Sequence, residues 1–145
     1  MAQNVPAKEK LKDFITKLEF LGYKITVISK KPQIYSINDK LVNIRSRGRV
    51  KETTYGRVFW YSVAFAVLKE VNWVIYLTTT SDYFYMIPSK FLEDVKANMY
   101  EDTSKAEVGI FNIDWGNEHL ELKGKTIPIS KYNHNLTNQQ DYPKF

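Results

Sequence analysis

The sequence predicts an α+β protein, in which an N-terminal helix precedes a mixed, largely antiparallel β-sheet with one or two further helices. Apolar residues recur at helical spacing near the N-terminus, and later segments are short, aromatic or β-branched runs separated by turn-forming residues. No internal repeat or Gly/Ser-rich linker interrupts the 145 residues. We therefore expect a single globular domain over residues 1–130, followed by a polar, loosely ordered tail over residues 131–145.

The first predicted helix spans residues 7–21, between Pro6 and Gly22. An apolar stripe follows the i, i+3, i+4, i+7 pattern, and its members are Leu11, Phe14, Ile15, Leu18 and Leu21. The lysines and Asp13 are expected on the opposite, solvated face. The stripe predicts that this helix packs one side against the sheet.

The strands are predicted from alternating or aromatic runs. Residues 23–29 form the first strand, and residues 34–37 and 41–45 form a hairpin that turns at Asn38-Asp39. The later expected elements are strands at 57–62, 73–77 and 83–87, a helix from 89, and a hairpin of 108–113 with 119–122. Residues 64–71 fit either a short helix or a longer strand, and both remain open.

Positive charge is concentrated in one stretch of a basic chain. The net charge is +5 and the isoelectric point is about 9.2, and all four arginines fall within 13 residues. Glu52 is the only acidic residue between Lys40 and Arg57. Arginine suits phosphate and base edges, so the stretch predicts a nucleic-acid surface, although a solvated hairpin tip is the alternative. The candidate cations are Lys40, Arg45, Arg47, Arg49, Lys51 and Arg57.

Aromatic residues lie beside these cations. Tyr55, Trp60 and Tyr61 are the aromatic residues expected to be exposed next to the arginines, where they could stack on bases. Core packing is the competing use for each ring, because one face of the strand must fill the interior.

Several functional classes are excluded or disfavoured by composition. The chain has no cysteine and only His119 and His134, which argues against disulfides, thiolate zinc sites and cysteine nucleophiles. It has no glycine-rich phosphate loop and no G-x-S-x-G elbow. The longest apolar run is too short to cross a bilayer and the N-terminus lacks a secretory pattern, so we expect a cytoplasmic protein without a membrane partner.

One segment resembles the PD-(D/E)XK nuclease superfamily, which has the restriction-endonuclease-like fold. Pro32-Gln33 stands where those enzymes carry Pro-Asp, and Asn43-Ile44-Arg45 stands where they carry Glu-x-Lys on the next strand. The resemblance implies a restriction-endonuclease-like core in which a helix precedes this hairpin and a further strand and helix follow. In the family, the two acids hold a magnesium-type ion.

The residues at those positions differ from the family pattern. Gln33 and Asn43 offer neutral amides, and Arg45 cannot lose a proton to act as a base. The expectation is a DNA-binding protein without catalytic activity or metal cofactor. It would bind double-stranded DNA, as a recognition domain or subunit of a restriction or mobile-element system.

Two alternatives remain. Asp114, Glu121 and Lys123 retain the acidic pattern on a later hairpin, so the chain could be an active, magnesium-dependent endonuclease. A third hypothesis is a protein-interaction subunit that binds no nucleic acid, whose aromatic strands form a homodimer interface.

Overall fold

The computed structural model describes residues 7–46, 51–53, 56–78 and 80–145, and it describes only the backbone of residues 51–53 and 56–60. Within these ranges the chain is α+β with an N-terminal helix, as the sequence predicts. The helices are α1 (Ala7–Phe20), α2 (Phe65–Leu68) and α3 (Ser89–Val95), with 3₁₀ turns η1 (Lys96–Asn98), η2 (Ser130–Tyr132) and η3 (Gln139–Asp141). None of the described helices is both long and apolar enough to cross a lipid bilayer.

The strands form two sheets rather than the one expected. The first sheet is mixed, in the order β1 (Ile25–Lys30), β2 (Gln33–Ile37), β3 (Lys40–Arg45), β6 (Trp73–Leu77), β7 (Tyr83–Pro88) and β12 (Asn133–Asn135). Only its β3–β6 pair is parallel. The second sheet is antiparallel, in the order β11 (Lys125–Pro128), β10 (His119–Leu122), β9 (Val108–Asp114), β5 (Gly56–Ala64) and β4 (Lys51–Thr53), and β8 (Tyr100–Glu101) also pairs with β9.

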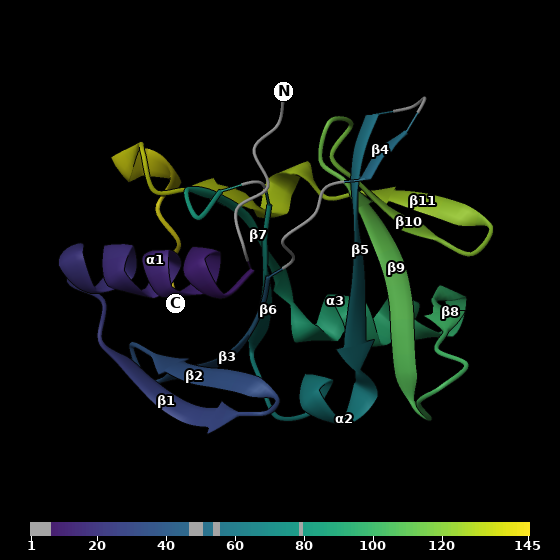
Figure 1. The fold of residues 1–145 in the computed structure, drawn as a ribbon, viewed down its shortest axis with the longest axis horizontal. Coiled ribbons are helices and arrows are strands. Elements are labelled where there is room, and N and C mark those ends of the chain that lie inside the picture. The colour runs from purple at the N-terminus through teal and green to yellow at the C-terminus, as the bar shows by residue number, and fades with distance from the viewer. Residues whose placement is uncertain (1–6, 47–50, 54–55, 79) are drawn as a thin grey trace.

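The first sheet lies between two apolar layers. On one face, α1 contributes Phe14 and Leu18 to a cluster with β3, β6 and β7, and Figure 1 shows this helix beside the first sheet. On the other face, the second sheet together with α2 and α3 closes a larger cluster. Strand β6 is apolar along its whole length because its alternate residues enter both clusters.

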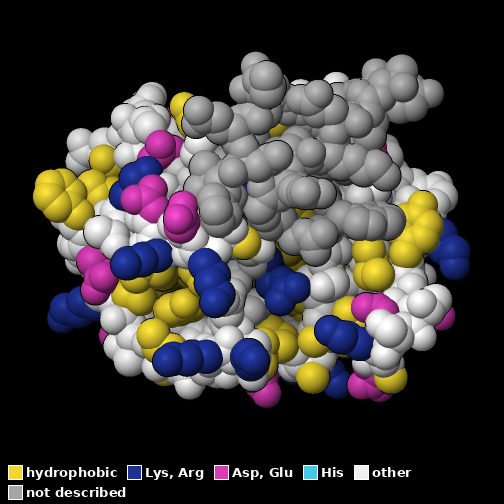
Figure 2. Space-filling model, viewed as in Figure 1, with side chains coloured by type: hydrophobic (Ala, Val, Ile, Leu, Met, Phe, Trp, Pro, Cys, Tyr) yellow, Lys and Arg dark blue, Asp and Glu magenta, His cyan; other side chains and the backbone are white. Residues whose placement is uncertain are grey.

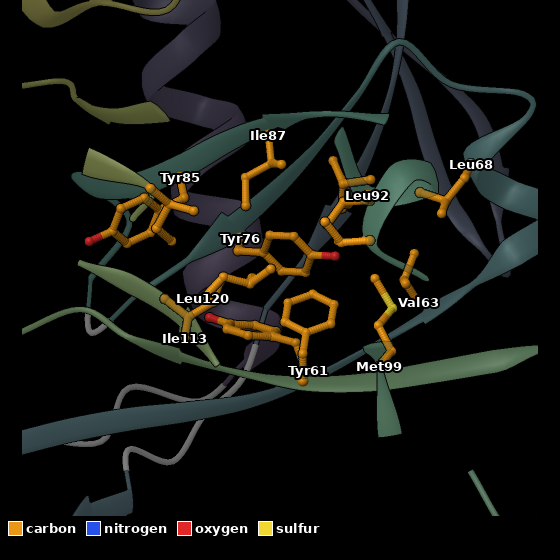
Figure 3. Packing of buried hydrophobic residues seen from close by; sticks show 14 of the residues in the cluster. Tyr61, Val63, Leu68, Tyr76, Tyr85, Ile87, Leu92, Met99, Ile113 and Leu120 are labelled. Atoms are coloured by element: carbon orange, nitrogen blue, oxygen red, sulfur yellow. The ribbon is translucent and has the colours of Figure 1, made fainter. Parts of the chain in front are cut away.

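Aromatic rings fill the core between the two sheets (Figure 3). Tyr61 of β5 and Tyr76 of β6 lie with ring centroids 4.6 Å apart, and Tyr76 contacts Phe111 of β9 edge-on at 5.4 Å. The Tyr61 hydroxyl donates a hydrogen bond to the Leu77 carbonyl. Since Tyr61 is only 2% exposed, the expectation that it offers an exposed ring for stacking is wrong.

The chain after residue 130 is not a loose tail. Strand β12 pairs with β7 at the edge of the first sheet, and Leu136 joins the cluster under α1. The ring of Phe145 packs edge-on against Tyr23 and Trp73, with ring centroids 5.7 and 5.9 Å apart. A few apolar side chains therefore hold a segment whose polar composition suggested disorder.

One lysine of α1 also departs from the expected pattern. Lys10 is 2% exposed, lies on the buried side of the helix with Phe14 and Leu18, and donates a hydrogen bond to the Thr78 carbonyl. Burial lowers the pKa of its ammonium group to about 8. The solvated face of α1 therefore carries fewer lysines than the sequence predicts.

Candidate nucleic-acid interface

Strands β2 and β3 form the expected hairpin. The turn residues Asn38 and Asp39 have φ angles of 49° and 69°, as a tight two-residue turn requires. The register pairs Ile37 with Lys40 at the turn and Ile34 with Asn43 towards the open end. The hairpin thus brings Gln33, Asn43 and Arg45 to the same end of the sheet.

The register nevertheless separates their side chains. Asn43 lies opposite Ile34, and both side chains point towards the cluster between the two sheets. Because neighbouring residues of a strand point to opposite faces, the Gln33 side chain lies on the α1 face, as that of Tyr35 does. Asn43 is 2% exposed, and its Nδ2 donates a 2.8 Å hydrogen bond to the Gln33 carbonyl. The amide of Asn43 therefore holds the hairpin together and does not share a ligand site with the Gln33 side chain.

Arg45 ends β3 beside the second sheet. Its Nη2 donates a 3.0 Å hydrogen bond to Ser62 Oγ of β5, and the residue as a whole is half-buried. Tyr76 pairs with Arg45 in the parallel β3–β6 ladder, and its hydroxyl is fully buried. Desolvation raises the pKa of this hydroxyl, and the nearby positive charge of Arg45 offsets part of that rise. Arg45 is thus anchored at one nitrogen and still accessible to a ligand.

A basic pocket lies at this end of the hairpin. Its volume is about 420 Å³, and its described lining is Lys30, Lys31, Pro32, Gln33, Arg45 and Ser46. Both lysines are exposed, and no aspartate or glutamate is among the described residues that line it. Ser46 Oγ donates a 3.0 Å hydrogen bond to the Ala7 carbonyl, which brings the start of α1 to the pocket. The pocket can therefore offer three cations and the Gln33 amide to an anion.

The other predicted cations and rings divide into three groups. Lys40 lies at the turn end of β3, about 17 Å along the strand from Arg45, so the two do not share a site. Lys51 belongs to β4, and Arg57 and Trp60 belong to β5; for these three residues the structure describes the backbone alone. Outside the described residues lie Arg47, Arg49 and Tyr55.

In the later hairpin, β9–β10, the predicted acidic ligand Asp114 forms hydrogen bonds within the turn. Asp114 is 2% exposed, and its Oδ1 accepts hydrogen bonds from the backbone amides of Gly116 and Asn117, each at 3.1 Å. Its Oδ2 accepts a 2.8 Å bond from Asn117 Nδ2. The carboxylate therefore closes the β9–β10 turn.

The remaining residues of that alternative are dispersed. Glu121 lies in the middle of β10 opposite Asn112 and Thr126, while exposed Lys123 follows the strand and donates its backbone amide to Asn98. No group of three or more histidine, aspartate or glutamate side chains able to hold a metal ion occurs within the described ranges. The described geometry does not support a metal site on this hairpin.

Sequence reasoning missed Lys30 and Lys31 as site residues. Neither is among the candidate cations predicted from the sequence, yet both line the pocket beside Arg45. Their position directly before Pro32, at the start of the motif-bearing hairpin, was the available signal.

No protein-family model matches this sequence, and neither a curated protein nor a solved structure shows significant similarity to it.

Proposed function

We propose that this protein binds DNA through the basic pocket at the open end of the β2–β3 hairpin and does not cleave it. The observation that carries the proposal is the convergence of Lys30, Lys31 and Arg45 on one pocket with no described acidic lining residue. Phosphate oxygens are the ligands such a group prefers, since arginine binds them with its planar fork and lysine as a point charge.

The position of the pocket in the chain strengthens the proposal. Ser46 lines it, and the chain continues directly into the segment that carries Arg47 and Arg49. The pocket thus marks where the arginine-rich stretch begins.

The absence of cleavage is proposed from the chemistry of the side chains. A magnesium ion needs anionic oxygen ligands, and the motif positions carry the neutral amides of Gln33 and Asn43. Arg45 keeps its proton at any working pH, so it can hold a phosphate but cannot activate water.

The test compares two matched pairs of lysines, each at a hairpin turn. The Lys30→Ala/Lys31→Ala variant removes two charges from the pocket, and Lys123→Ala/Lys125→Ala removes two exposed charges from the β10–β11 turn. Binding of a labelled duplex is followed by fluorescence anisotropy at low salt. We expect the first variant to lose about tenfold or more in affinity and the second to stay within about twofold of the unmodified protein.

Equal losses in both variants would show that binding follows net charge alone and would contradict the proposed pocket. No binding by the unmodified protein to duplex DNA, at any salt concentration tested, would overturn the proposed function itself.

A further inference from the structure

A hollow lies between α1 and the β1–β2 edge of the first sheet. Its volume is about 380 Å³, and its apolar lining is Leu11, Ile15, Val27 and Tyr35. Lys8 and Lys12 of α1 also line it, both exposed, and Glu19 is its one described acidic lining residue. In Figure 2 the apolar surface at the lower left, over α1, β1 and β2, has several basic side chains, drawn dark blue, around it, with acidic side chains at its left and upper edges.

The hollow adjoins the basic pocket along β2. Tyr35 lines the hollow and Gln33 lines the pocket, and these residues are two apart on one strand, so they share the α1 face. The hydrogen bond from Ser46 to Ala7 places Lys8 at the same junction. An anionic chain held in the pocket would therefore meet the hollow next.

The apolar surface here is open to a ligand. Val27 is 52% exposed on the edge strand β1, and Tyr35 is only partly buried against the cluster under α1. A duplex hides the faces of its bases, whereas an unpaired strand presents bases that can stack on an aromatic ring while its phosphates meet cations at the rim.

We propose that the hollow binds an unpaired nucleotide strand that continues from a duplex held at the basic pocket. This inference rests on the proposed function, because the pocket supplies the phosphate contacts that direct the strand towards Lys8. The preferred ligand is then a duplex with a single-stranded tail. Charge complementarity supports this occupant, because two lysines, Lys8 and Lys12, line the hollow against the single described acid, Glu19. The two lysines belong to the first half of α1, which is the half nearest the basic pocket.

The experiment measures the affinity of the full chain for three labelled DNAs. These are a blunt duplex, the same duplex with a tail of about six thymidines, and a blunt duplex lengthened by about three base pairs. The longer duplex adds the same number of phosphates as the tail but no free bases. We expect the tail to raise affinity about fivefold or more above the longer duplex, as stacking of one or more bases would.

Two neighbouring residues provide matched variants. Val27→Glu places a negative charge in the hollow, while Ile28→Glu adds the same charge at an equally exposed residue, 55% accessible, that does not line it. The quantity measured is the affinity for the tailed duplex divided by the affinity for the lengthened blunt duplex. A general effect of the added charge alters both affinities equally and so cancels in this ratio. Val27→Glu should lower this ratio to about one and Ile28→Glu should preserve it, while Tyr35→Leu, which keeps an apolar side chain, should at least halve it.

The outcomes separate this inference from the proposed function. Normal duplex binding without any gain from the tail, or equal ratios in the two glutamate variants, would overturn the inference and leave the proposed function intact. Such a result would favour another occupant, such as an acidic peptide. Absence of binding to all three DNAs would overturn both.

Discussion

The β2–β3 and β9–β10 hairpins carry the two sets of residues that the sequence pattern predicts as nuclease-like sites, and the polar side chains of the two hairpins make different contacts. In the later hairpin, the carboxylate of Asp114 is buried and accepts hydrogen bonds from its own turn. In the earlier one, the buried amide of Asn43 closes the hairpin while Arg45 stays accessible beside two lysines. A polar side chain on a strand is therefore available to a ligand only where nearby backbone groups do not already form hydrogen bonds with it.

The largest expected effect concerns the packing that supports the earlier hairpin. Leu18 is fully buried in one cluster with Val42 and Ile44 of β3, so Leu18→Ala should destabilise the protein by about 2–5 kcal/mol. Phe20→Ala, on the same helix but 89% exposed, should cost no more than about 0.5 kcal/mol. Chemical denaturation measures both, and similar costs for the two variants would contradict the described packing of α1.

The next effect tests the structural role of Asp114 in the later hairpin. Asp114→Ala removes three hydrogen bonds that a buried carboxylate accepts from its own turn and should cost about 1–3 kcal/mol. Glu121→Ala, at a half-buried position on the same hairpin, should change stability by less than about 0.5 kcal/mol. Neither change should alter DNA affinity when the variants are folded. A loss of DNA binding in either folded variant would assign function to this hairpin and reverse the comparison.

No gain in metal binding is expected from placing the family's residue types in the earlier hairpin. Gln33→Asp combined with Asn43→Glu and Arg45→Lys recreates the metal-binding residue types, but the register directs the side chain at 33 to the other face of the sheet. Calorimetry with magnesium chloride should therefore detect no binding beyond that of the unmodified protein. Clear magnesium affinity in the folded triple variant would show that the three positions do share a site.

No effect at all is expected in a cleavage assay. Plasmid and oligonucleotide DNA should remain intact with magnesium or manganese, at protein excess and long incubation, because neither hairpin assembles the anionic ligands such ions need. Cleavage that disappears in Asp114→Ala or Glu121→Ala would transfer the active site to the later hairpin. Cleavage that survives both would require acids elsewhere in the chain.

Local patterns predicted much of the fold. The periodicity of α1 and the Asn38-Asp39 turn are confirmed, and the expected strands at 73–77 and 119–122 agree with β6 and β10. The second sheet and β12 were missed because both depend on pairings between distant segments. Strand β12 is held by its pairing with β7 and by neighbouring Leu136, neither of which its polar residues reveal.

The candidate site was less predictable for a related reason. Residue type identified Arg45, but the roles of Asn43 and Asp114 depend on hydrogen bonds that the sequence pattern does not specify. The position of Tyr61 beside the cations predicts an exposed ring, whereas the register pairs Tyr61 with Phe111 and directs its side chain into the core. Which face of a strand is buried is decided by the layer that covers it, and here that layer is a separate sheet.

The central claim is that a cluster of cations beginning at the open end of the β2–β3 hairpin binds the phosphates of DNA. Its most direct test is the salt dependence of duplex binding for the unmodified protein and for the Arg45→Ala/Arg47→Ala/Arg49→Ala variant. Each phosphate contact contributes about −0.9 to the slope of log K against log salt concentration, so removing three contacts should make the slope shallower by about 2.7 and abolish most of the binding at moderate salt. The same affinity and slope in a folded triple variant would contradict the claim.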